Sequence, residues 1–102
     1  MSPEGLSLLI IVLGVLRDKQ WKKIARLVDF YADEIIFTEP VSERALSPVH
    51  FDRLQLKSKY CIINDPLDAY RTAISNADPD CLVVVTGSMY LVGYIRKYIS
   101  AD

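Results

Sequence analysis

The segment with the clearest chemical potential is residues 82–96, where an apolar strand pattern runs through Thr86, Gly87 and Ser88 directly into a helical pattern. A strand that turns into a helix without a loop places a small hydroxyl and unpaired backbone N–H groups at the carboxyl edge of a sheet. Proteins with α/β folds bind their ligands at this edge. The segment therefore predicts a ligand contact for Ser88, with Tyr90 close by. Both have a structural alternative, Ser88 as the N-cap of the helix and Tyr90 as a packing residue.

Three further segments, residues 14–19, 38–47 and 64–65, each follow an apolar strand pattern and are expected at the same edge. They would surround it with charges of both signs. The cations are Arg17, Lys19 and Arg44, and the anions are Asp18, Glu39, Glu43 and Asp65. Mixed charge beside helix N-termini suits a small zwitterionic or anionic ligand.

Arg44 is the strongest candidate among these charges, because it lies in the middle of a long irregular segment and its planar guanidinium matches a carboxylate bidentately. A solvated surface position is the alternative for Arg44, as it is for Arg17 and Lys19. Asp18 has the alternative role of capping the helix that follows it. Asp65 precedes a proline and is interpreted as a helix cap.

Several catalytic classes have no support in this sequence. It contains no Gly-x-Gly-x-x-Gly, no Gly-x-x-x-x-Gly-Lys-Ser/Thr and no Gly-x-Ser-x-Gly. His50 is the single histidine, which argues against a catalytic triad and a His/Cys metal site. Cys61 and Cys81 fall within apolar strand patterns and are interpreted as buried small hydrophobes in a reducing cytosol. The net charge of −1 is scattered, which favours neither a nucleic-acid nor a membrane partner.

Four apolar runs alternate with four helical patterns along these 102 residues. The strands are expected at 6–14, 33–38, 59–64 and 81–86, and the helices at 20–31, 48–57, 66–76 and after residue 88. Strands spaced in this way need crossover helices, so we expect one α/β domain over 1–102, a three-layer sandwich with a mostly parallel, Rossmann-like sheet. The apolar run at 8–16 is too short to span a bilayer, and the chain is expected to be soluble and cytoplasmic.

Four segments in order resemble the C-terminal domain of folylpolyglutamate synthase/dihydrofolate synthase, a branch of the Mur ligase superfamily. Residues 13–20 (LGVLRDKQ) are similar to a Gly-x-x-x-Asp-Lys-Asp segment, and 32–38 (ADEIIFT) to an Ala-Asp-x-apolar-apolar-x-Thr strand. Residues 42–46 (SERAL) are similar to a Pro-Arg-Ala segment, with glutamate in place of proline. Residues 83–93 (VVVTGSMYLVG) are similar to Val-Val-Thr-Gly-Ser-Leu-Tyr-Leu-Val-Gly.

The resemblance implies an activity for a larger enzyme. Enzymes of this family use ATP and Mg²⁺ to activate a folate or dihydropteroate carboxylate as an acyl phosphate, which the amine of L-glutamate attacks. Ser88 would help to bind the incoming L-glutamate, and Arg44 would lie near its carboxylates. Asp18, Lys19 and Tyr90 would face the cleft towards the ATP domain. Synthesis of polyglutamates, of dihydrofolate or of both is compatible with these residues.

The resemblance also implies missing parts. The phosphate-binding loop and the Mg²⁺ ligands of the family belong to a central ATP-binding domain, and the Asp-Gly-Ala-His-Asn-Pro motif opens its C-terminal domain. None of these has a counterpart here. We therefore expect a domain truncated on its N-terminal side, inactive alone and binding no cofactor alone, whose partner is the N-terminal ATP-binding domain. The alternative is a stand-alone, non-catalytic flavodoxin-like module for ligand binding or interaction.

Overall fold

The computed structural model describes residues 8–100, in which four strands alternate with helices. In chain order the elements are β1 (Leu8–Leu13), α1 (Trp21–Tyr31), β2 (Glu34–Phe37), the 3₁₀ helix η1 (Pro48–Arg53), β3 (Lys59–Ile62), α2 (Pro66–Asn76), β4 (Cys81–Thr86) and α3 (Met89–Ser100). The expected alternation of strands and helices is confirmed. Residues 6–7 of the first predicted strand lie outside the described residues.

The four strands form one sheet in the order β3-β2-β1-β4, and every neighbouring pair is parallel. β1 lies between β2 and β4, with Ile11 opposite Ile35 on one side and opposite Val84 on the other. Parallel neighbours cannot be joined by a tight hairpin, so each connection crosses a face of the sheet. The prediction of a parallel α/β sheet is confirmed.

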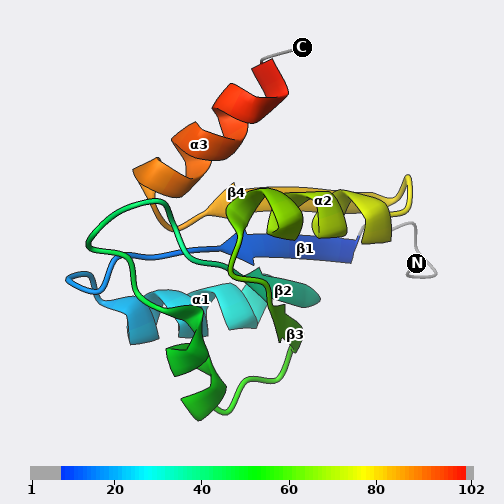
Figure 1. Cartoon of the computed structure of the whole chain (residues 1–102). Helices are drawn as coiled ribbons and strands as arrows, with labels where there is room; N and C mark the ends of the chain where they lie inside the picture. The colour runs from blue at the N-terminus through cyan, green and yellow to red at the C-terminus, as the bar shows by residue number, and fades with distance from the viewer. Residues whose placement is uncertain (1–7, 101–102) are drawn as a thin grey trace.

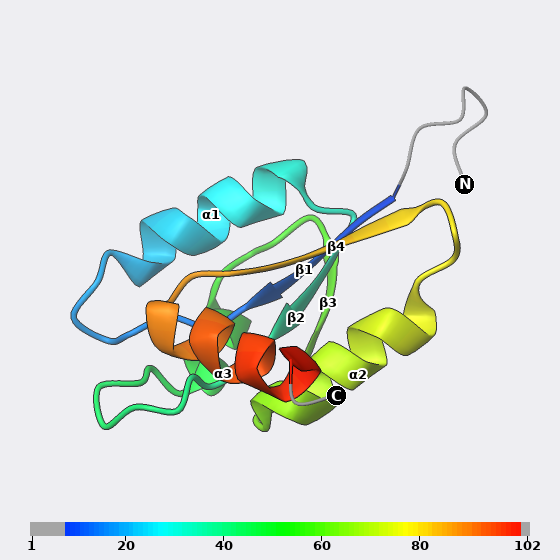
Figure 2. The ribbon, with the colours of Figure 1, turned by 90° about the horizontal axis from the view of Figure 1, so that it is seen from above.

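Helices cover both faces, which gives the three layers seen in Figures 1 and 2. α1 and η1 lie on one face, and α2 and α3 lie on the other. The chain moves from β1 through β2 to β3 with its connections on the α1 face. It then returns across the α2 face to β4, on the far side of β1.

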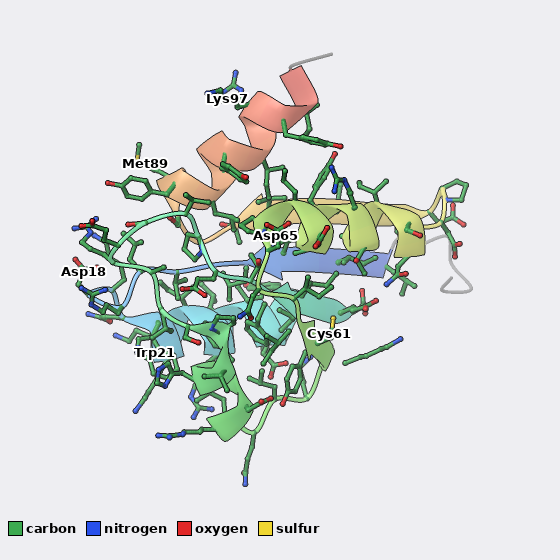
Figure 3. All side chains as sticks on the ribbon, viewed as in Figure 1. Asp18, Trp21, Cys61, Asp65, Met89 and Lys97 are labelled. Carbon is green, nitrogen blue, oxygen red and sulfur yellow. The ribbon has the colours of Figure 1, made fainter. Side chains whose placement is uncertain are left out.

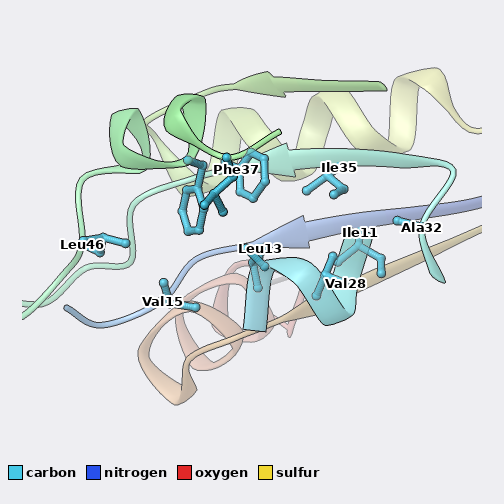
Figure 4. Packing of buried hydrophobic residues seen from close by; sticks show 11 residues of the cluster. Ile11, Leu13, Val15, Val28, Ala32, Ile35, Phe37 and Leu46 are labelled. Atoms are coloured by element: carbon cyan, nitrogen blue, oxygen red, sulfur yellow. The ribbon is translucent and has the colours of Figure 1, made fainter. Parts of the chain in front are cut away.

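The core on the α1 face is built around aromatic rings (Figure 4). Phe37 of β2 stacks on Phe51 of η1, with ring centroids 4.1 Å apart. Trp21, the first residue of α1, meets Phe51 edge-on at 5.5 Å. The contacts hold η1 and the start of α1 against the sheet, and Val28 continues the same core along α1.

The core on the opposite face is smaller and relies on alanine. Ala69 and Ala73 of α2 are fully buried against Ile10, Val12 and Ile36 of the sheet. Small side chains four residues apart let the helix lie close to the strands. α3 is anchored by a second buried pair in the same arrangement, Leu91 and Ile95.

The helix expected at 48–57 is wrong in type and in length. The segment forms a 3₁₀ helix that ends at Arg53, where the Leu54 amide donates to the Phe51 carbonyl three residues earlier. The hydroxyl of Ser47, the expected N-cap, makes no capping bond. The burial of Phe51 sets this geometry, because a 3₁₀ turn delivers its ring onto Phe37 before the chain straightens.

The expectation that both cysteines are buried is also wrong. Cys61 is exposed on β3, which forms one edge of the sheet, and Cys81 is half-buried. An apolar run does not show which strand lies at an edge. Partial burial, followed by the nearby carboxylate of Glu34, raises the pKa of the Cys61 thiol, so the thiol is held protonated at neutral pH.

Candidate functional site

The candidate site lies where the winding of the sheet reverses direction. β1 and β4 are neighbours, but the chain leaves β1 towards β2 and reaches β4 only after crossing back. In open α/β sheets the crevice at the carboxyl ends of two such strands is the preferred ligand position. The segments that follow β1 and β4 meet at this point.

Two glycines allow these segments to approach each other. Gly87 has a φ of 107°, a conformation that favours glycine, and a Cβ at this position would lie 2.5 Å from the carbonyl oxygen of Gly14. The Gly14 amide in turn donates to the Thr86 carbonyl at 3.3 Å. The strand of Thr86 can therefore turn into α3 directly against the end of β1.

A short antiparallel pairing holds the loop after β2 against the segment that follows β1. Leu16 and Ala45 form an isolated bridge. The Arg17 amide donates to the Arg44 carbonyl at 2.8 Å, and the Arg17 guanidinium donates to the carbonyl of Glu43. This pairing places the side chain of Arg44 beside the ends of β1 and β4, although Arg44 and Thr86 are 42 positions apart in the sequence.

These segments surround an open cavity of about 770 Å³. Its lining residues are Leu16, Lys19, Arg44, Thr86, Gly87, Ser88, Met89 and Tyr90. Figure 3 shows Asp18 and Met89 at this end of the molecule, with Lys97 at the far end of α3. Four of the five residues predicted from the sequence, Ser88, Arg44, Lys19 and Tyr90, thus line one cavity.

Arg44 and Asp18 form an ion pair across the mouth of the site. The Arg44 Nη1 atom lies 3.2 Å from Asp18 Oδ2, and each side chain is 48% exposed. Each of these two side chains therefore has a charged partner within the chain itself, without a ligand. Asp18 does not cap α1, since the N-cap position belongs to Gln20 and carries no side-chain bond. The alternative role of Asp18 as a helix cap is therefore wrong.

Ser88 stands at the start of α3, and its Oγ accepts a hydrogen bond from the Tyr90 amide at 3.1 Å. The hydroxyl oxygen of Ser88 therefore caps α3, which was the structural alternative for this residue. The hydroxyl proton is a separate donor, because a serine side chain accepts and donates at once. The Ser88 carbonyl receives the Val92 amide and so begins the helical hydrogen bonding.

Segments 38–47 and 64–65, also expected at this edge, contribute only Arg44 to the lining of the cavity. Asp65 caps α2, accepting from the Asp68 amide at 2.9 Å, as expected. The Asn64 carbonyl holds the hydroxyl of Thr38 at 3.0 Å. Neither Asp65 nor Glu39 lines the cavity. Asp65 follows β3, which β2 separates from β1. Glu39 follows β2, and its amide donates to the Asn64 carbonyl after β3 at 3.2 Å. Leu16 and Met89 were missed, since an apolar side chain in a loop or first turn gives no local signal for a ligand site.

The described residues, 8–100, include no group of three or more His, Cys, Asp or Glu side chains placed to hold a metal ion. Within the same range, no helix has the length and apolar character needed to cross a membrane. The polar chemistry of the cavity therefore comes from two cations (Lys19 and Arg44), the hydroxyl-bearing side chains of Thr86, Ser88 and Tyr90, and backbone groups.

The fold and the position of the cavity define a class, the doubly wound α/β domains that bind ligands at a switch point. Within that class the chain is similar to several solved structures, among them the following three. One is FolC of Escherichia coli with DHPP and ADP, at a TM-score of 0.82 and 19% identity over 92% of this chain and 22% of that chain. Another is the folylpolyglutamate synthase of Mycobacterium tuberculosis with ADP and AMPPCP, at a TM-score of 0.77 and 28% identity over 95% of this chain and 24% of that chain.

A bifunctional folylpolyglutamate synthase/dihydrofolate synthase with Mn, AMPPNP and L-glutamate bound is the third, at a TM-score of 0.81 and 20% identity over 95% of this chain and 24% of that chain. The fold is thus that of a Mur ligase C-terminal domain, and the resemblance found in the sequence is confirmed at this level. The chain spans about a quarter of the length of the structures it matches. No family model and no curated protein matches the sequence.

Proposed function

We propose that this chain is the glutamate-side domain of an ATP-dependent amide ligase that adds L-glutamate to a folate or to dihydropteroate. The observation that carries the proposal is the convergence of Arg44, Lys19 and Ser88 on one cavity at the switch point. Its support from outside the chain is the likeness in fold to a synthase whose structure has L-glutamate bound.

The two cations suit the two carboxylates of L-glutamate. The planar guanidinium of Arg44 can hold a carboxylate bidentately, and the ammonium of Lys19 acts as a point charge. Arg44 is bonded to Asp18, but the pair is half exposed. Such a pair contributes about 0–1 kcal/mol, so a ligand carboxylate can replace Asp18 as the partner of Arg44 at little cost.

Ser88 can serve the helix and the ligand together. Its Oγ accepts from the Tyr90 amide, which leaves the hydroxyl proton free to be donated to a carboxylate oxygen. The first turn of α3 adds the positive end of the helix dipole at the same position. The proposed roles are therefore charge pairing for Arg44 and Lys19 and hydrogen bonding for Ser88, with Asp18 holding Arg44 before the ligand arrives.

ATP and Mg²⁺ are assigned to the rest of the proposed enzyme. The described residues offer no cluster of acidic or histidine ligands for a metal ion, and Thr86–Ser88 is too short to wrap a triphosphate. In the proposal, an N-terminal ATP-binding domain activates the folate carboxylate in the cytoplasm, and this domain positions the amine donor.

A titration of the ¹⁵N-labelled chain with L-glutamate tests the proposal. We expect amide shifts confined to residues 86–90 and Arg44, with binding in the millimolar range, about −4 kcal/mol. L-Glutamine, which lacks the side-chain carboxylate, should bind several-fold more weakly. Arg44→Gln should weaken glutamate binding about tenfold, the loss of one charge-assisted contact. Arg53→Gln is the matched control, because Arg53 is an exposed cation on η1 that does not line the cavity.

Shifts spread over the surface, or equal binding of L-glutamine, would contradict the glutamate site and favour a flavodoxin-like interaction module. Within a complete enzyme the role of Ser88 has its own test. Ser88→Ala should raise the KM for L-glutamate more than the KM for ATP. An unchanged KM for L-glutamate would remove Ser88 from the site.

A further inference from the structure

Beyond the ligand cavity, α1 carries a line of exposed side chains on the side that faces away from the sheet. We call it the α1 ridge, and it consists of Lys23, Arg26, Leu27 and Phe30. Ala25 and Val28 of the same helix are buried against the sheet. Each residue of the α1 ridge is two positions from one of these buried residues, about 200° around the helix. The α1 ridge therefore points away from the core.

The position of α1 in the fold leaves this ridge open to the surroundings. α1 lies at the outside of the molecule, in the helix layer on one face of the sheet (Figure 2). Helices that cover one face of a sheet lie side by side in a layer, with their axes about 8–10 Å apart. A helix added to that layer would contact the flank of α1 and leave the α1 ridge uncovered. The ridge is therefore available to a molecule outside the fold.

The C-terminal half of the α1 ridge is apolar. Leu27 and Phe30 are 61% and 67% exposed, and their spacing of three residues makes them neighbours on the helix surface. The exposed ring of Tyr31 meets the ring of Phe30 edge-on, with centroids 4.9 Å apart. Single exposed apolar residues are common, but large ones that lie together mark an interaction site. Aromatic residues and arginine are enriched at such sites.

The N-terminal half of the α1 ridge is basic. Lys23 and Arg26 are exposed, and neither belongs to an ion pair among residues 8–100. Asp29 is the single acidic residue of α1, and its carboxylate accepts hydrogen bonds from the Lys57 and Ser58 amides just before β3. It is therefore not available to the two cations. A partner that covered the ridge would leave both charges unpaired unless it carried carboxylates of its own.

We propose that the α1 ridge docks another protein through an acidic amphipathic helix. The contact face of that helix carries carboxylates against Lys23 and Arg26 and apolar side chains against Leu27 and Phe30. The ridge has the i, i+3, i+4, i+7 spacing of a helical contact face, so a second helix can lie along it for about 10 Å. The opposite charges select the partner and set its register, and the exposed rings supply the apolar contact.

A membrane surface and a nucleic acid fit the α1 ridge less well. A helix that lies in a membrane surface has apolar side chains along its whole length and cations on the other side. On the α1 ridge the two kinds of residue share one face and are separated along the helix axis. A nucleic acid requires an extended basic surface, whereas this chain has a net charge of −1 and the ridge has two cations. An acidic helix matches both halves of the ridge.

The α1 ridge is independent of the proposed glutamate site. None of its four residues lines the cavity, which lies at the carboxyl ends of β1 and β4. α1 begins after the carboxyl end of β1 and ends just before β2, so Phe30 lies towards the opposite end of the sheet. A helix bound along the ridge leaves the cavity open. The test of either proposal therefore stands without the other.

The test is a titration of the ¹⁵N-labelled chain with a designed sixteen-residue helical peptide. One end of its contact face carries two glutamates and the other end carries leucine and phenylalanine, in both orders along the helix, for parallel and antiparallel packing. A control peptide has lysine in place of both glutamates. We expect saturable amide shifts confined to residues 22–31, with a Kd below about 1 mM. The lysine peptide should bind about tenfold more weakly.

Substitutions on the α1 ridge test its two halves separately. Phe30→Ser should weaken binding of the acidic peptide about tenfold, because it removes the exposed ring. The double change Lys23→Glu with Arg26→Glu should reverse the preference, so that the lysine peptide binds more tightly than the acidic one. Val41→Ser, at an exposed apolar residue of the loop after β2, is the matched control for Phe30→Ser and should leave binding unchanged. All these side chains are exposed, so the variants should keep the fold.

Each other outcome overturns the proposal. Equal binding of the two peptides, or no saturable shift at about 1 mM, shows that the α1 ridge does not recognise an acidic helix. Tighter binding to phosphatidylserine vesicles or to oligouridine than to the acidic peptide assigns the ridge to a membrane or to RNA. A dimer in sedimentation that Phe30→Ser abolishes assigns it to a second copy. Undiminished binding by Phe30→Ser removes the apolar half from the contact.

Discussion

Gly87 is the residue on which the geometry of the cavity depends most directly. Its φ of 107° and the 2.5 Å approach of a Cβ to the Gly14 carbonyl oxygen leave no room for a side chain. We expect Gly87→Ala to lower the free energy of unfolding by about 3 kcal/mol, from backbone strain and overpacking together. Urea unfolding of the purified variant measures this.

Gly93 provides the matched control for that substitution. A Cβ at Gly93 in α3 would meet nothing within 4 Å. Gly93→Ala should therefore raise the free energy of unfolding by about 0.5–1 kcal/mol, the difference in helix propensity. Equal losses in the two alanine variants would contradict the argument from close approach at Gly87.

Asp29 should give the domain an acid-sensitive component of stability. Burial raises the pKa of its carboxyl, but hydrogen bonds from the Lys57 amide and from Ser58 outweigh burial and lower the pKa below 3.8. A lowered folded-state pKa stabilises the fold above the unfolded value, about 3.9, and this stabilisation is lost as pH falls through the folded value.

The test is the free energy of unfolding of Asp29→Asn as a function of pH. At pH 7 the variant should be less stable by about 1–2 kcal/mol, because the amide NH2 group, a donor, replaces one of the two carboxylate oxygens that accept from the Lys57 and Ser58 amides. Below pH 4 its stability should fall less steeply than that of the parent chain. An identical slope in both proteins would show that Asp29 does not titrate with folding.

Some of these residue roles were open to prediction from the sequence. Ser88, Asp65 and Gly87 follow from strand, cap and turn patterns, which are local. The ion pair of Asp18 with Arg44 was not predictable in the same way, because the two residues are 26 positions apart and meet through the bridge of Leu16 with Ala45. Long-range polar pairs of this kind leave no periodic signal.

At the scale of elements, η1 is held by its aromatic contacts and lacks a capping bond. Phe51 is fully buried, stacked on Phe37 and met edge-on by Trp21. Phe51→Ala should lower the free energy of unfolding by about 3–5 kcal/mol, from lost transfer energy and the cavity left behind. Val49→Ala, an exposed neighbour in η1, should change it by less than about 0.5 kcal/mol.

Thermal or urea unfolding of the two variants separates packing from helix propensity. A similar loss in both would mean that η1 itself, and not the ring of Phe51, stabilises this face. The sequence could not predict that η1 is a 3₁₀ helix, since Ser47 followed by Pro48 is a start signal common to α and 3₁₀ helices. The helix ends early because of contacts between the rings of Trp21, Phe37 and Phe51, which come from three different elements. Contacts between distant elements leave no local pattern in the sequence.

At the scale of the whole molecule, the parallel topology could be predicted because strand spacing admits crossover connections alone. The order of the strands could not. Apolar runs look alike in a central and an edge strand, and exposed Cys61 on β3 and exposed Leu82 on β4 show the consequence. The switch point between β1 and β4, and with it the position of the cavity, depends on that order.

The strand order also sets how stability is distributed through the molecule. β1 has a strand partner on each side and helices on both faces, whereas β4 is paired on one side among the described residues. Native-state amide exchange should therefore give the highest opening free energies in β1 and β2, close to the global value, and lower ones in β4. α3 joins α2 partly through Arg71, which donates to the Tyr98 hydroxyl oxygen at 2.8 Å. Arg71→Gln should speed exchange in α3 and leave β1 unchanged, and uniform acceleration throughout the sheet would contradict this distribution.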